Sequence, residues 1–169
     1  MDQPLVIIGS ARMNGNTKKM VDFVFAGRNY TEIDLLAYQL FPYNYDDDYP
    51  TSDRFEELVE IINQHKIIIF ATPVYWYAMS GLMKTLFDRL TTLVTTKKEM
   101  GRNLKGKTVS LIAVGTDPEL PDGFEIPFSL TASYLKMNYQ QRIYFTEDQH
   151  IIDLAKQQEI KAFLSRISG

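Results

Sequence analysis

One polar segment, residues 9–17, combines the residue types that bind phosphate groups. It reads Gly-Ser-Ala-Arg-Met-Asn-Gly-Asn-Thr and follows an apolar run at residues 5–8. Its glycines let backbone amides approach a ligand, its hydroxyl and amide side chains can donate hydrogen bonds, and Arg12 adds a positive charge. A helical pattern begins at its end, and a helix N-terminus favours an anion. We therefore expect a phosphate monoester here; the alternative is a polar turn that only caps the helix.

A second segment, residues 72–81, places three consecutive aromatic side chains after the most hydrophobic run of the sequence. They are Tyr75, Trp76 and Tyr77, behind the apolar run 67–70. Because loops after strands are usually polar, these aromatics suggest that a flat ring system lies against them. The alternative is that they cap the core or pack across a subunit interface.

A third segment, Gly115-Thr116, follows another apolar run. Its glycine would let the backbone approach a ligand closely; the alternative is a simple turn.

Apolar runs alternate with helical patterns along the whole chain. The runs predict strands near residues 5–8, 30–34, 67–70, 109–114 and 138–145. Three of them are continuously hydrophobic, as in strands covered on both faces, and the last alternates like an edge strand. Parallel strands need such crossover helices. The pattern predicts an α/β fold: a single flavodoxin-like domain over residues 1–169, a doubly wound three-layer sandwich with a five-stranded parallel sheet in the order 2-1-3-4-5. Ligands of such sheets bind beyond the carboxyl ends of strands 1 and 3, where the first two segments lie.

Composition excludes several classes of protein. The chain has 169 residues, 12% aromatic residues and a formal net charge of −3, which argues against disorder and against nucleic acid as a partner. It has no Cys and two His, so disulfides, thiolate metal sites and Cys nucleophiles are excluded and no metal is expected. ATP-binding and dinucleotide-binding glycine motifs are missing as well. Without a membrane-spanning run or a basic leader, we expect a cytoplasmic protein with no membrane contact.

Together these motifs resemble those of the NAD(P)H-dependent FMN reductase family of flavodoxin-like flavoproteins. Residues 9–17 are similar to its Gly-Ser-x-Arg-x-x-Gly-Asn-Thr phosphate loop, and residues 72–76 to its Thr-Pro-x-Tyr-Trp segment. Residues 80–89 are similar to its Ser-Gly-x-x-Lys-x-x-x-Asp-Arg helix. The resemblance implies bound FMN, with NADPH or NADH as hydride donor, and a homodimer with the site at its interface. The implied cofactor-binding residues are Ser10, Arg12, Asn14, Asn16 and Thr17 at the phosphate, Pro73, Val74, Tyr75 and Trp76 along the flavin, and Gly115 and Thr116 after the fourth strand.

The function that the resemblance implies is an FMN-dependent oxidoreductase. It would take hydride from NAD(P)H and pass electrons to a quinone, free flavin, azo or nitroaromatic acceptor by a ping-pong mechanism. Since the flavin carries the chemistry, no catalytic side chain is expected. One alternative is a flavodoxin-type electron carrier that does not oxidise nicotinamides. Another is a flavin-free domain that binds a different phosphorylated aromatic ligand.

Two groups of charged residues outside these segments are also open to interpretation. One group is basic and consists of Lys97, Lys98, Arg102 and Lys105. It either forms a solvated surface or attracts the phosphates of a nicotinamide dinucleotide. Asp88 and Arg89 are expected to form a structural pair at the end of a helix.

Overall fold

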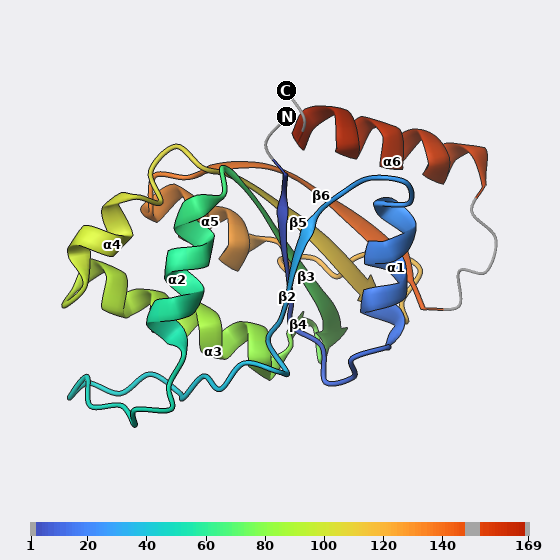
Figure 1. The fold of residues 1–169 in the computed structure, drawn as a ribbon. Coiled ribbons are helices and arrows are strands. Elements are labelled where there is room, and N and C mark those ends of the chain that lie inside the picture. The colour runs from blue at the N-terminus through green and yellow to red at the C-terminus, as the bar shows by residue number, and fades with distance from the viewer. Residues whose placement is uncertain (1–2, 148–152, 168–169) are drawn as a thin grey trace.

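The computed structural model of the chain describes residues 3–147 and 153–167. Parallel strands form one sheet in the order β2-β1-β3-β5-β6, with helices on both of its faces (Figure 1). The order confirms the predicted doubly wound topology, and β6 is the predicted edge strand. The strands are β1 (Leu5–Ile8), β2 (Thr31–Asp34), β3 (Ile67–Tyr75), β5 (Thr108–Gly115) and β6 (Asn138–Thr146).

The helices form the two outer layers of the sandwich. The first layer holds α1 (Asn16–Val24) and α6 (Leu154–Ile167). The second holds α2 (Phe55–Gln64), α3 (Gly81–Arg89) and α5 (Ile126–Tyr134), with the 3-10 helix η1 (Leu90–Val94) and the short α4 (Lys98–Arg102) after α3. In the described part of the chain, no helix is long and apolar enough to cross a membrane.

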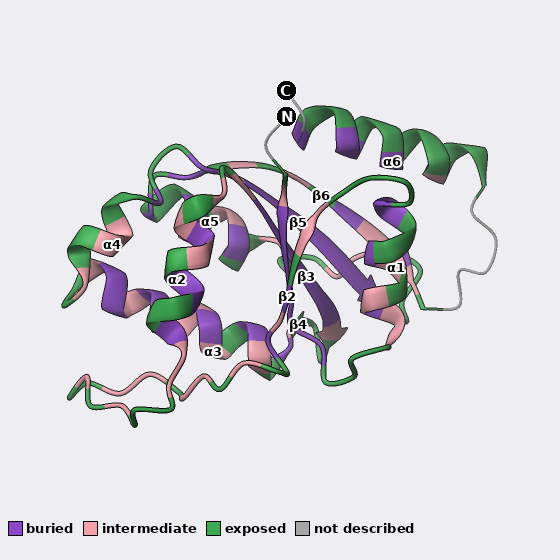
Figure 2. Ribbon diagram, viewed as in Figure 1, coloured by how far each residue is buried: buried purple, intermediate pink, exposed green. Residues whose placement is uncertain are grey.

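Burial explains why the central strands lack alternation. All four residues of β1 are buried, because helices cover both of its sides (Figure 2). Its odd-numbered residues, Leu5 and Ile7, join the core under α2 and α3. Its even-numbered residues, Val6 and Ile8, join the core under α1 and α6. Two hydrophobic cores therefore hold the sheet and fix the positions of the strand ends.

A short antiparallel strand, β4 (Ala78–Met79), was not predicted from the sequence. It folds back on the end of β3, so that Tyr75 lies opposite Ala78. The two residues of the turn between the strands, Trp76 and Tyr77, have φ angles of 49° and 64°. Two-residue hairpin turns normally use Asn and Gly for such angles, so aromatic residues gave no hairpin signal.

The predicted pair of Asp88 and Arg89 is wrong. Consecutive residues on a helix point in different directions, so these side chains cannot meet. Asp88 instead contacts Lys84 one turn earlier, at 2.6 Å. Arg89 is 2% exposed and donates to both carboxylate oxygens of Asp53, at 2.8 and 2.9 Å.

The Arg89–Asp53 pair fixes the long loop between β2 and α2 against α3. Arg89 also donates to the carbonyl oxygen of Phe41, and its guanidinium lies 3.5 Å from the ring centroid of Tyr49. Burial alone would raise the pKa of Asp53. The hydrogen bonds from Arg89 and from the amides of Phe41 and Phe55 outweigh burial and hold this pKa below its ordinary value.

Candidate functional site

The fold brings the three predicted segments together at one edge of the sheet. Residues 9–17 follow β1, residues 72–79 contain the end of β3 and the hairpin, and Gly115 ends β5. Strand β3 lies between β1 and β5 and pairs with both. The amide of Gly9 donates to the carbonyl oxygen of Ala71 at 2.8 Å, which joins the first segment to β3. This is the carboxyl edge, where doubly wound folds bind ligands.

The first segment forms a tight turn ahead of α1. The amide of Arg12 donates to the hydroxyl of Ser10 at 3.3 Å, and the amide of Gly15 donates to the carbonyl oxygen of Arg12. Gly15 is the N-cap of α1, and no side chain of the described residues caps the helix there. The first amides of α1 are thus available to an anion, which weakens the alternative that Ser and Asn only cap the helix.

The predicted phosphate-binding residues differ in exposure. Ser10 and Thr17 are buried, Asn16 is half-buried, and Arg12 and Asn14 are exposed. A Cβ added to Gly15 would lie 3.1 Å from the Cβ of Arg12, so the turn leaves little room for a side chain. Asn16 donates to the carboxylate of Glu147 at 3.4 Å. No pattern in the sequence pointed to Glu147, which lies 131 residues away.

Ser80 connects this turn to the other elements of the edge. Its hydroxyl donates to the carbonyl oxygen of Gly9 at 2.5 Å and accepts from the amide of Met83 at 3.1 Å. Its amide donates to the hydroxyl of Thr72. A Cβ added to Gly9 would lie 3.0 Å from that of Met83, so a larger residue would force Met83 to shift. One serine therefore caps α3 and fixes where the first segment begins.

The aromatic segment lies at the surface. Tyr75, Trp76 and Tyr77 are 46%, 92% and 69% exposed, whereas Pro73 is buried and Val74 half-buried. The alternative that the tip aromatics cap the core is therefore wrong. Positive φ angles at bulky residues cost about 1–3 kcal/mol each, and such strain is concentrated at functional sites. The hairpin leaves its three rings exposed at the surface.

The third segment is positioned by Tyr144 of β6, which sequence reasoning missed. A Cβ added to Gly115 would lie 2.7 Å from the hydroxyl oxygen of Tyr144 and 3.1 Å from the Cβ of Val74. Burial, together with the negative charges of Asp117 and Glu147, raises the pKa of Tyr144. Its protonated hydroxyl donates to the carbonyl oxygen of Asp117 at 2.7 Å. Tyr144 thereby fixes the loop that contains Thr116, which is exposed.

Next to this loop lies an open depression of about 640 Å³. It is lined by Tyr77 from the hairpin and by residues 117–122. Within the described residues, no group of three or more His, Asp or Glu side chains could hold a metal ion. This edge therefore offers a ligand hydrogen-bond donors and aromatic rings.

The residues present fit FMN. Uncapped amides at the start of α1, the hydroxyl of Ser10 and the charge of Arg12 suit a phosphate. The exposed rings of the hairpin suit a flat ring system a short distance away. A doubly wound sheet with such an edge defines the class of flavodoxin-like proteins.

The chain belongs to the NADPH-dependent FMN reductase family, whose model matches residues 4–150. The match confirms the family predicted from the sequence. The family is described as that of NADPH-dependent FMN reductases, which is the class of oxidoreductase expected from the sequence.

The chain is also similar to individual proteins. YwqN of Bacillus subtilis (strain 168), named as an NAD(P)H-dependent FMN-containing oxidoreductase, is 31% identical over 119 residues. That region spans 66% of each chain, just under two thirds of YwqN. The structure of the Trp repressor binding protein from Bacillus subtilis matches with a TM-score of 0.73 and 25% identity, over 98% of this chain and 97% of that one.

A more distant structure shows the fold alone. General stress protein 14 of Treponema denticola, solved in complex with FMN, has a TM-score of 0.65 and 19% identity, and 98% of each chain is covered.

Proposed function

We propose that this chain is an FMN-dependent oxidoreductase that takes hydride from NADPH or NADH and reduces a small-molecule acceptor. The observation that carries the proposal is the uncapped N-terminus of α1, which lies at the same sheet edge as an exposed aromatic hairpin. Membership of the FMN reductase family supports it. When bound, FMN supplies the redox chemistry, accepting hydride and passing electrons on in a ping-pong sequence.

At the phosphate end, the proposed ligands are the side chains of the first segment and the first amides of α1. The buried hydroxyls of Ser10 and Thr17 are neutral donors, and Arg12 supplies the charge that offsets a dianion. Asn14 is free to turn toward the ligand, since it is exposed. Asn16 would exchange its long contact with Glu147 for the phosphate.

At the ring end, the proposed contacts are the end of β3 and the end of β5. Pro73 and Val74, which are buried and half-buried, would contact one side of the ring system. The exposed side chains of Tyr75 and Trp76 would pack against it from the solvent side. Gly115, the last residue of β5, and Thr116 after it would approach the ring system from the other side. Backbone amides near residues 75–77 and 115 would stabilise negative charge on the ring, so no side chain is assigned as a general acid.

The acceptor site proposed is the open depression between Tyr77 and residues 117–122. Its volume of about 640 Å³ and the ring of Tyr77 in its wall suit flat acceptors such as quinones, free flavins, azo compounds or nitroaromatics. The similarity to YwqN supports the same nicotinamide and flavin chemistry. The proposal includes the homodimer and the cytoplasmic location expected from the sequence.

Anaerobic stopped-flow spectroscopy tests the proposal. Mixing the FMN-loaded protein with NADPH or NADH is expected to bleach the visible absorbance of the flavin. If neither nicotinamide bleaches it, the enzyme proposal is wrong and the flavodoxin-type carrier takes its place. A protein that does not bind added FMN would favour the flavin-free alternative.

A matched pair of arginine variants tests the phosphate end. Arg12→Ala removes a charge-assisted hydrogen bond, so the Kd for FMN is expected to rise about 10- to 100-fold. Arg28→Ala removes an exposed arginine beyond the other end of α1 and should leave this Kd unchanged. Fluorescence titration of FMN measures both, and equal Kd values would contradict the assignment of Arg12.

A further inference from the structure

The depression beside the candidate site is negatively charged. All the charged residues that line it, among those described, are acidic: Asp117, Glu119 and Asp122. All three are exposed, and no described Lys or Arg forms an ion pair with any of them. By contrast, Glu125, the N-cap of α5, is paired with Arg142 at 2.7 Å. Three carboxylates without a partner around one depression create a potential that attracts cations and repels anions.

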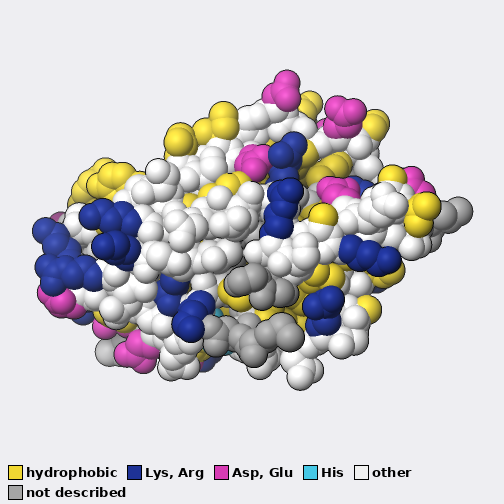
Figure 3. All heavy atoms as spheres, turned by 90° about the horizontal axis from the view of Figure 1, so that it is seen from above, with side chains coloured by type: hydrophobic (Ala, Val, Ile, Leu, Met, Phe, Trp, Pro, Cys, Tyr) yellow, Lys and Arg dark blue, Asp and Glu magenta, His cyan; other side chains and the backbone are white. Residues whose placement is uncertain are grey.

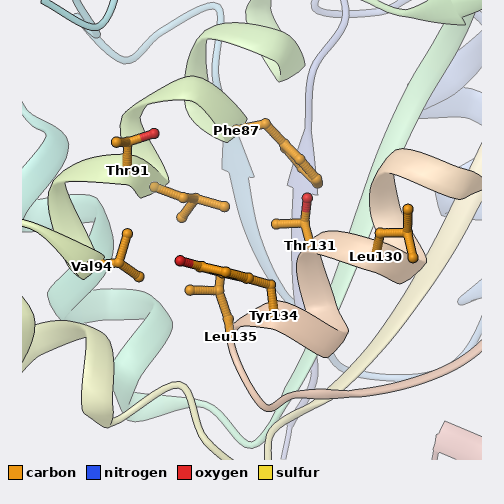
Figure 4. Close-up of a pocket in the computed structure, with 8 residues that line it drawn as sticks. Phe87, Thr91, Val94, Leu130, Thr131, Tyr134 and Leu135 are labelled. Atoms are coloured by element: carbon orange, nitrogen blue, oxygen red, sulfur yellow. The ribbon is translucent and has the colours of Figure 1, made fainter.

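Two other hollows differ from this depression in charge. One, of about 340 Å³, lies between α5 and the segment formed by α3 and η1, and none of its described lining residues is charged (Figure 4). In the other, of about 450 Å³, the charged lining residues of the described chain are all basic: Lys98, Arg102, Lys105 and Lys136. Of these three hollows, the depression beside the candidate site alone attracts cations.

The basic hollow is too far from the depression to neutralise it. The carbonyl oxygen of Lys136 accepts from the amide of Gly106, just before β5 begins, whereas the depression follows the end of β5. The eight residues of β5 place these two edges of the sheet about 25 Å apart. Seen from above, lysine and arginine side chains gather at the end of the molecule where Figure 1 places α4 (Figure 3). Since the Debye length is about 10 Å in 0.1 M salt, the acidic potential persists at the candidate site.

The shape and the wall of the depression suit an organic cation and not a metal ion. In the part of the chain that the structure describes, no group of three or more His, Asp or Glu side chains could hold a metal. The volume of about 640 Å³ falls in the range of pockets that hold small organic ligands, about 300–1,000 Å³. The ring of Tyr77 in the wall is 69% exposed, and an aromatic face attracts both flat rings and cations. The depression therefore combines the features that bind a planar aromatic cation.

We propose that the acceptor site selects planar aromatic cations that become neutral when they accept hydride. The inference rests on the proposed function and deepens it, because it names the charge class of the acceptor. In the net reaction, NADPH or NADH loses one hydride ion, which is one proton with two electrons, and becomes NADP⁺ or NAD⁺. The acceptor cation gains this hydride as a new N–H or C–H bond and becomes a neutral molecule.

This loss of charge lets the depression distinguish the substrate from the product. The carboxylates of Asp117, Glu119 and Asp122 attract the oxidised cation, whereas the neutral product is held by ring contacts alone. Product release is therefore favoured after each reduction. The same potential weakens the binding of anionic acceptors and of the anionic nicotinamide donor, so added salt should affect a cationic acceptor and the donor in opposite directions.

Equilibrium dialysis of methylene blue, a planar cation, tests the site without turnover. The acidic-loop variant combines Glu119→Gln with Asp122→Asn, and its FMN-loaded form is expected to bind the dye with a Kd about three to ten times that of the wild type at low salt. The control variant combines Glu60→Gln with Glu99→Gln, which removes the same net charge from exposed positions of α2 and α4, and it should keep the wild-type Kd. Retained FMN absorbance shows that each variant is folded.

Three results of the dialysis would overturn the proposal. The wild type might bind no dye, or the acidic-loop variant might bind it as tightly as the wild type. Equal weakening in both double variants would also overturn it, because the dye would then respond to the overall charge of the protein and not to the depression.

Anaerobic stopped-flow kinetics test the selectivity during electron transfer. The FMN-loaded protein is reduced by light and mixed with methylene blue, with neutral menadione or with dichlorophenolindophenol, which is an anion at pH 7. In the acidic-loop variant, the rate constant for methylene blue divided by that for menadione is expected to fall about three- to tenfold at low salt, and the corresponding ratio for dichlorophenolindophenol is expected to rise. Each ratio is compared between proteins, so differences in redox potential among the acceptors cancel. The same change for all three acceptors, or no change, would overturn the proposal.

The experiment separates this inference from the proposed function, because light and not a nicotinamide reduces the protein. If the wild type oxidises neither NADPH nor NADH, the proposed function fails, while the ratios still decide whether the depression selects cations. If the wild type oxidises a nicotinamide and the ratios stay the same in the acidic-loop variant, the selectivity alone is wrong.

Discussion

Arg89 and Asp53 are the residues through which the long loop before α2 is held in place. Arg89 is almost completely buried and satisfies its charge with one carboxylate, one backbone carbonyl and the faces of two aromatic rings. Removing one partner of such a pair leaves the other buried and unpaired, which costs more than the pair itself contributes. The contact therefore makes the loop sensitive to the protonation of a single carboxylate.

Asp53→Asn is expected to lower the free energy of unfolding by about 3–5 kcal/mol. Asp46→Asn, at an exposed aspartate of the same loop, should change the free energy of unfolding by less than about 0.5 kcal/mol.

The stabilisation by Asp53 should also depend on pH. Because the folded-state pKa of Asp53 lies below its unfolded value, its contribution to the free energy of unfolding is complete above about pH 4 and is lost as the pH falls through the folded pKa. Urea unfolding from pH 7 to pH 3 measures this, and a difference between wild type and Asp53→Asn that does not shrink at low pH would refute it.

At the scale of elements, the hairpin of β3 and β4 exposes aromatic rings through a turn whose backbone angles lower its stability. Its turn holds Trp76 and Tyr77 at φ angles that bulky side chains disfavour. Only two pairs of residues, Val74 with Met79 and Tyr75 with Ala78, close the hairpin. One hydrogen bond beside the hairpin supports this geometry, since the hydroxyl of Thr72 in β3 accepts from the amide of Ser80, just after β4.

Two substitutions of Tyr77 separate backbone strain from loss of the ring. Tyr77→Gly and Tyr77→Ala remove the same ring, but glycine adopts the positive φ without strain. Tyr77→Gly is expected to be about 1 kcal/mol more stable than Tyr77→Ala in urea unfolding. Both variants should reduce acceptor turnover to the same degree. Equal stability of the two would show that the turn stores no strain.

At the scale of the whole molecule, the doubly wound topology gathers segments far apart in sequence at one edge. Residues near positions 10, 75 and 115 become neighbours because β1, β3 and β5 lie side by side. A ligand that bridges these strand ends binds the folded chain only, so its binding free energy adds to the stability of the fold.

Saturating FMN is therefore expected to raise Tm. At about 100 times Kd the gain is about 2.7 kcal/mol, which corresponds to about 5–10 °C for a chain of this size. Riboflavin, which has the same rings and no phosphate, should raise Tm less at the same concentration. Thermal unfolding followed by circular dichroism compares the two. Equal shifts would mean that the segment ahead of α1 does not hold the phosphate.

Much of this architecture could be predicted from local patterns. Continuous apolar runs revealed the buried strands, because both faces of the sheet are covered. Glycine, hydroxyl and amide residues directly after β1 indicated the candidate phosphate site, because the chemistry and the spacing lie within nine consecutive residues. The apolar runs and the polar segment after β1 could be recognised because each is formed by residues that are neighbours in the sequence.

Two of the missed features depend on contacts between distant residues. Arg89 reaches Asp53, 36 residues away, and Tyr144 reaches Asp117, 27 residues away. Neither pair has a local signature, so sequence reasoning assigned Arg89 to its neighbour Asp88. The hairpin was missed for a different reason, since its turn lacks the residues that normally allow its geometry.

Trp76 gives the molecule a built-in optical reporter. It is the only tryptophan of the chain, and it is 92% exposed at the tip of the hairpin. Intrinsic indole emission of the entire protein therefore comes from one position at the candidate site. Anything that settles over that tip shields the indole from a soluble quencher such as iodide, so site occupancy can be followed without attaching a dye.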